Sequence, residues 1–133
     1  MIQLMRSELR KPQFRAAITK ISECSKLDTK VAYNFMRLIR VIDKLSHEVM
    51  VGFNDFVAEH VETDAEGKFL LNDEMNEFRW KSGVDGDSAK KALHEFGTGQ
   101  LDTGRETFTL DDLAPVGLTV LDLEAIEPLF TIH

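Results

Sequence analysis

One run of apolar residues constrains the fold of this chain more than any other feature. Its members are spaced alternately by four and three residues, the heptad spacing of a helix that packs along one side. We call these residues the heptad seam: Val31, Phe35, Leu38, Ile42, Leu45 and Val49. Asp28 precedes the run as an N-cap, and the pattern resumes at Phe53 after Gly52. The spacing predicts one helix over residues 29–61, about 50 Å long, with a weak point at Gly52.

A helix of this length carries more apolar surface than we expect so small a domain to cover. A second apolar edge at Ala32, Met36 and Ile39 widens the stripe beyond that of a strict two-stranded coiled coil. Part of the stripe should therefore meet another copy or another protein. The sequence predicts a homo-oligomer with the heptad seam at its interface.

Short elements flank the predicted long helix. Before it, residues 1–10 suit an edge strand or an ordered arm, and Pro12 opens a short helix. After it, residues 62–68 have the composition of a turn, and a cap at Asn72 or Asp73 predicts a further helix. That helix would carry three large side chains: Met75, Phe78 and Trp80.

The last third of the chain alternates turns with short elements. A helix is predicted over residues 88–96 and a flexible glycine-rich loop over 97–104. Residues 107–110 are β-branched or aromatic in alternation, which predicts a short strand. Thr119 and Asp122 form a capping box that opens a final short helix.

Together these elements predict one α+β, mostly α domain over residues 1–133. A long amphipathic helix packs on a shorter helix in a helical part, about residues 12–61. A compact C-terminal part, about residues 62–133, contains short helices and one or two short strands. Residues 1–50 hold ten Lys or Arg against five Asp or Glu, whereas residues 51–133 hold six against eighteen. The C-terminal part is therefore acidic, and its charge complements the basic half within one chain or between copies.

Several chemistries are disfavoured by the residues present. The four histidines share no metal-ligand spacing with one another or with Cys24, and the motifs of a nucleophile elbow or a phosphate-binding loop are missing. We expect no catalytic residue, no metal and no cofactor. The lone Cys24 favours a reducing, intracellular compartment. Without a signal-peptide core or a run of roughly 20 apolar residues, no contact with a membrane is expected.

Basic residues on the predicted long helix form the candidate binding group. Lys30, Arg37 and Lys44 are spaced by seven residues, and Arg40 lies three beyond Arg37. Such residues are commonly solvated, or flank a helical interface where they pair with Asp or Glu. The sharper alternative is an anion site, for a nucleotide or a phosphate backbone, assembled where two copies meet. The net charge of −7 makes nucleic acid the least favoured of the partners considered.

The order of these landmarks resembles that of small uncharacterised proteins encoded by tailed bacteriophages. The resemblance covers about residues 26–130 and rests on the helical stretch over 30–48, the turn over 64–68 and the ending over 107–129. It implies a viral origin and action in the cytoplasm of the infected host cell or in the virion. It implies no particular functional residue.

Two hypotheses of function follow from these patterns. The first is a non-enzymatic structural or assembly protein that acts through protein–protein contacts, with itself and with other phage proteins. The second is a ligand-binding protein that sequesters a host nucleotide, or another small anionic signal, between subunits.

Overall fold

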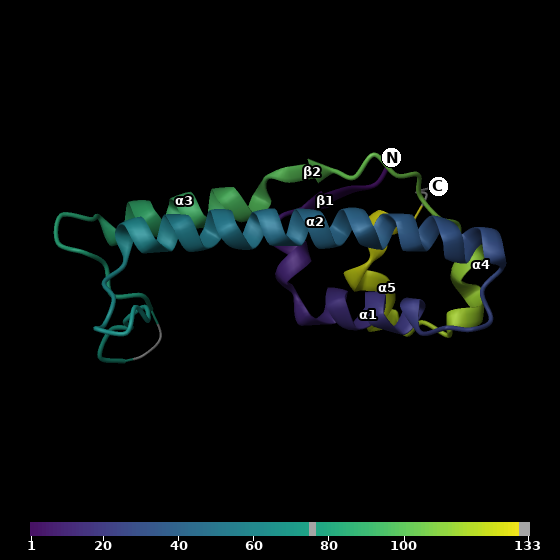
Figure 1. The fold of residues 1–133 in the computed structure, drawn as a ribbon, viewed down its shortest axis with the longest axis horizontal. Helices are drawn as coiled ribbons and strands as arrows, with labels where there is room; N and C mark the ends of the chain where they lie inside the picture. Colours follow the sequence, from purple (N-terminus) through teal and green to yellow (C-terminus); the bar gives the residue numbers. More distant parts are fainter. Residues whose placement is uncertain (75–76, 131–133) are drawn as a thin grey trace. The chain divides into compact units, whose positions relative to one another are not determined.

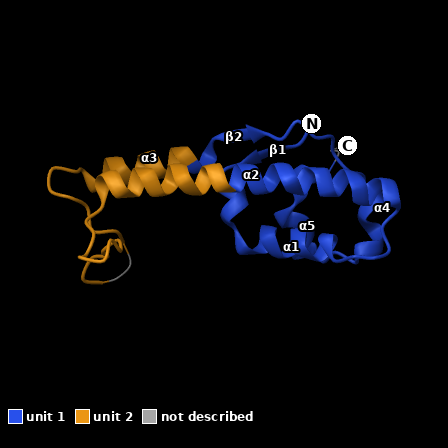
Figure 2. Ribbon diagram, viewed as in Figure 1, with its two compact units in different colours: residues 1–46, 97–133 blue, residues 47–96 orange. Residues whose placement is uncertain are grey.

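A computed structural model describes residues 1–74 and 77–130 of the chain. It is mostly helical, with a small antiparallel sheet, and so confirms the predicted α+β, mostly α class (Figure 1). The chain divides into two compact units (Figure 2): unit 1 is residues 1–46 with 97–133, and unit 2 is residues 47–96. The sequence predicts a single domain whose helical part ends near residue 61. The boundary between the two units lies elsewhere, because residues late in the chain pack with N-terminal residues.

The longest helix, α2, spans Thr29–His60, in agreement with the prediction. Asp28 caps it, since its carboxylate accepts a 3.0 Å hydrogen bond from the backbone N–H of Lys30. The helix continues through Gly52. A Cβ atom built there would lie 3.2 Å from the ring of Phe96, so the missing side chain lets this ring pack closely in unit 2.

In unit 1, helix α1 (Pro12–Ser22) begins with Pro12 in its first turn, as predicted. Its apolar stripe is buried and consists of Phe14, Ala17 and Ile21. Helix α5 (Val120–Ala125) packs beside α1 (Figure 1). It opens with the predicted capping box, in which Thr119 and Asp122 exchange hydrogen bonds.

The sheet of unit 1 joins strands β1 (Gln3–Met5) and β2 (Gln100–Asp102), with Leu4 opposite Leu101. The N-terminal strand is thus confirmed, whereas β2 lies in the stretch predicted as a glycine-rich loop. Pairing with a strand almost a hundred residues away, rather than local β-propensity, determines where β2 forms.

The strand predicted over residues 107–110 is wrong. Phe108 makes a single parallel bridge with Phe130. Leu110 already begins helix α4 (Leu110–Leu113), because Thr109 caps that helix in a second capping box with Asp112. The threonine therefore uses its hydroxyl group to open a helix. The described part of unit 1 also contains three single turns: η1 (Glu8–Arg10), η2 (Ala114–Val116) and η3 (Glu127–Leu129).

Helix α3 (Gly86–Thr98) confirms the helix predicted over residues 88–96 and extends it by two residues at each end. Before α3, residues 61–74 and 77–80 of unit 2 contain short extended segments joined by antiparallel bridges. Their hydrogen bonds close a ring: the N–H of Glu62 donates to Arg79, that of Arg79 to Leu70, and that of Leu70 to Glu62.

The prediction of a helix after Asn72 or Asp73 is wrong for two of the three large residues that it was expected to carry. Phe78 and Trp80 lie in an extended segment and bridge Leu71 and Val61. Ring contacts reinforce this arrangement, because Phe78 meets Phe69 and Trp80 edge-on, at centroid distances of 6.3 and 6.0 Å. Met75 lies outside the described residues.

Candidate functional site

The heptad seam faces the interior of its own chain. In unit 1, Phe35, Leu38 and Ile42 expose 5% of their surface or less, and Phe35 meets Phe108 edge-on at a centroid distance of 5.9 Å. In unit 2, Val49 exposes 4%. Val31 and Leu45, the remaining two, are half-buried. Such burial leaves the buried members almost no surface for a second copy, so an oligomer interface has to use other faces of the chain.

The basic group predicted as a binding site lies on the exposed side of α2. We call Lys30, Arg37, Arg40 and Lys44 the basic stripe, and all four are exposed. The guanidinium carbon of Arg37 lies 5.9 Å from the centroid of the Tyr33 ring, within reach of a cation–π contact. Among the described residues, no ion pair joins a member of the basic stripe to a carboxylate. These charges are available to a partner.

The basic stripe does not converge on one pocket. Lys30 lines a cleft of about 710 Å³ in unit 1, whereas the other three members of the stripe are not among its lining residues. Arg105 adds a second cation, and its Nε atom is buried without a hydrogen-bond partner among the described residues. Four carboxylates also line the cleft: Asp28, Glu106, Asp111 and Asp112. This acidic lining disfavours a phosphate group, which carries the same sign of charge.

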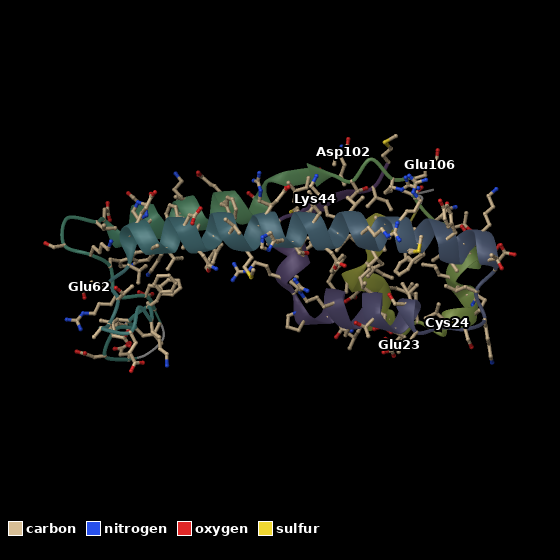
Figure 3. All side chains as sticks on the ribbon, in the orientation of Figure 1. Glu23, Cys24, Lys44, Glu62, Asp102 and Glu106 are labelled. Atoms are coloured by element: carbon tan, nitrogen blue, oxygen red, sulfur yellow. The ribbon has the colours of Figure 1, made fainter. Side chains whose placement is uncertain are left out.

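A smaller groove lies between α1 and α2 of unit 1, with a volume of about 220 Å³. Ile21, Cys24 and Leu27 line it from the α1 side, and the second apolar edge of α2 lines the other side: Ala32, Met36 and Ile39. The thiol of Cys24, which is labelled in Figure 3, makes a long contact of 3.8 Å with the carbonyl oxygen of Pro115. Met36 exposes 39% of its surface and lies at the mouth of the groove. The groove offers an apolar contact, and Met36 lies about one helical turn before Arg40 of the basic stripe.

Further apolar surface lies on the short helices of unit 1, where sequence reasoning did not look for it. Leu110 begins α4, and Val120 and Leu121 begin α5; each exposes more than 60% of its surface. The signal for these positions is present in the sequence, because each capping box fixes which residues form the first turn. Their exposure depends on how the helices pack, which the capping pattern does not specify.

Two carboxyl groups of unit 1 have perturbed pKa values, for opposite reasons. A 2.7 Å ion pair with Lys20, together with hydrogen bonds from Thr119, lowers the pKa of Asp122 to about 2. Gln13 also donates to Asp122, at 3.0 Å. This nearly buried carboxylate therefore ties α5 to α1. Burial raises the pKa of Glu8, against the opposing field of Lys11.

The chain matches no known protein-family model, and neither a curated protein nor a solved structure is significantly similar to it. Within the described ranges, no three or more His, Cys, Asp or Glu side chains gather in an arrangement that could hold a metal ion. None of the helices described is both long and apolar enough to span a membrane.

Proposed function

We propose that this protein catalyses no reaction and acts through protein–protein contacts, as a homo-oligomer with a structural or assembly role. The observation that carries the proposal is the exposed side of α2 in unit 1. There Met36, which lines the apolar groove and exposes 39% of its surface, lies one helical turn before Arg40, one of four cations that lack carboxylate partners among the described residues. Apolar contact area next to unpaired charge is typical of a surface that binds another protein.

The resemblance to proteins of tailed bacteriophages implies where this protein acts and what it binds. We propose that it works in the cytoplasm of the infected host cell or within the virion, and that its partners are further copies and other phage proteins. The basic stripe selects for acidic partners, because like charges brought together at an interface oppose association.

The test of this proposal is the molecular mass of the intact protein in solution, with and without a charge at the groove. Met36→Glu places a carboxylate at the groove mouth and should shift the oligomer towards the monomer in size-exclusion chromatography with light scattering. Leu110→Glu is the matched control, since Leu110 is also exposed in unit 1 but lies on α4. A protein that remains monomeric and captures no phage structural protein would contradict the proposal.

The alternative is a protein that sequesters a nucleotide or another small anion. The observation that favours it is the buried Nε atom of Arg105, which has no hydrogen-bond partner among the described residues and belongs to a side chain that lines the same cleft as Lys30. Its test is equilibrium binding of a fluorescent nucleotide, with Lys30→Gln and Arg105→Gln as variants and Arg40→Gln as the matched control outside the cleft. Loss of binding in the first two alone would favour the alternative. No binding to the unmodified protein would exclude the sequestration of a nucleotide.

A further inference from the structure

The charges of α2 change sign along the helix. Its first part, in unit 1, contains the basic stripe and a single acidic residue, Asp43. Its second part, in unit 2, contains Glu48, Asp55 and Glu59 but no Lys or Arg. We call these three residues the acidic stripe, and all three are exposed. Among the described residues they form no ion pair with a Lys or Arg.

The spacing of these charges places them on one side of a helix. Lys30, Arg37 and Lys44 are separated by seven residues, as are Glu48 and Asp55, and Glu48 follows Lys44 by four. Steps of four and seven return to the same side of an α-helix with 3.6 residues per turn. The basic and acidic stripes therefore lie on the same side of α2. The heptad seam, which is buried, lies on a different side.

The net charge of the protein is concentrated in unit 2. Unit 1 contains eleven Lys or Arg and eleven Asp or Glu, whereas unit 2 contains five against twelve. Two molecules that approach at random therefore repel each other through their acidic units. An arrangement that places the acidic stripe of one molecule against the basic stripe of another converts this repulsion into attraction.

We propose that two copies pair through their α2 helices in antiparallel orientation, with the basic stripe of each against the acidic stripe of the other. In a pair centred on Ser46, Lys44 faces the partner's Glu48 and Arg37 faces the partner's Asp55. In a parallel pair the two basic stripes would face each other, as would the two acidic stripes, and both contacts would be repulsive. The antiparallel pair is self-complementary and closes as a two-fold dimer. This inference rests on the proposed function, because it names the partner and the surface of that homo-oligomer.

Apolar side chains on the same exposed side supply contact area for the pair. Tyr33 lies in the first part of α2 and exposes 54% of its surface, and Val51 lies in the second part and exposes 43%. Each copy thus brings one large apolar side chain from either side of the centre of pairing. Burying them in the dimer stabilises it, while the charged stripes fix its orientation.

Charge reversal tests the pairing. The variant Arg37→Glu with Lys44→Glu makes both stripes acidic, and Glu48→Lys with Asp55→Lys makes both basic. Each variant alone should raise the dimer dissociation constant at least about tenfold, because four weak attractions become repulsions. An equimolar mixture should restore a one-to-one heterodimer, measured by native mass spectrometry and sedimentation equilibrium. The matched control is Arg15→Glu with Lys91→Glu, which reverses two exposed charges outside α2 and should leave the dissociation constant unchanged.

The mixture separates the loss of pairing from the loss of folding, because a misfolded variant would not be rescued by its counterpart. If the unmodified protein is oligomeric and both reversals keep its dissociation constant, the pairing is wrong while the proposed function stands. If both variants retain their circular dichroism but the mixture forms no heterodimer, the pairing is also overturned. A monomeric unmodified protein that still captures another phage protein overturns the pairing and limits the proposed function to contacts with other partners.

Discussion

The two compact units are stabilised in different ways, and the difference indicates which unit tolerates change. Unit 1 holds fourteen of the eighteen buried apolar residues among those described, and its acidic and basic residues balance. Unit 2 holds the other four and is strongly acidic. Its aromatic residues Phe69, Phe78 and Trp80 are only half-buried. The stability of unit 1 therefore depends on its buried core. The stability of unit 2 depends on ring contacts and close helix packing, which must outweigh the repulsion among its acidic residues.

The largest effect on stability is expected when a leucine is replaced by alanine in unit 1, compared with the same substitution in unit 2. Leu38→Ala removes a fully buried side chain from unit 1 and should lower the free energy of unfolding by about 2–5 kcal/mol. Leu93→Ala removes a half-buried side chain of α3 in unit 2 and should cost less than about 2 kcal/mol. Urea denaturation followed by circular dichroism measures both. Equal losses would show that the two units do not differ in their dependence on burial.

A smaller loss of stability is expected at Gly86, where unit 2 depends on the close packing of a glycine against Trp80. A Cβ atom at Gly86 would lie 2.8 Å from two atoms of the Trp80 ring, so Gly86→Ala forces the indole to move. The expected cost is about 1–3 kcal/mol, as for other overpacked sites. Trp80 is the single tryptophan of the chain, so its fluorescence reports on unit 2. The matched control is Lys91→Ala on the exposed side of α3; an unchanged emission spectrum in Gly86→Ala would contradict this packing.

The third effect is expected at Asp122; it is complete at neutral pH and disappears as the pH falls. The pKa of Asp122 is lowered from 3.8 to about 2 in the folded protein, so the unfolded chain binds the proton more readily. Its contribution to stability is therefore complete above about pH 4 and is lost as the pH falls towards 2. Asp122→Asn should remove this part of the acid dependence of unfolding, whereas Glu124→Gln, an exposed neighbour on α5, should retain it. A full acid dependence in Asp122→Asn would show that other carboxylates cause it.

Local signals in the sequence predicted much of the fold. The N-cap at Asp28, Pro12 at the start of α1 and the Thr119 capping box each act within a few residues, and each begins a helix where expected. The heptad spacing likewise predicted α2. These signals depend on backbone groups close in the chain, so a single sequence suffices to find them.

The remaining features depend on contacts between distant residues, and local patterns did not predict them. Strand β2 forms because β1 offers a partner, although Gln100 and Asp102 have no strand preference. The seam was expected to need a second copy because nothing in its spacing shows that Phe108 and other late residues cover it. The basic stripe was found from its spacing alone. Its acidic counterpart was missed, since the charges of residues 48–59 were not compared with those of residues 30–44.

Sedimentation equilibrium of the intact protein at low and high salt tests the pairing of the α2 helices most directly. We expect a dimer of about twice the 15.1 kDa chain mass at low salt. Its dissociation constant should rise several-fold between 0.05 and 0.5 M NaCl, concentrations of the order at which exposed charges become screened. A mass of 15.1 kDa at every protein concentration, or a dimer whose stability does not depend on salt, would contradict it.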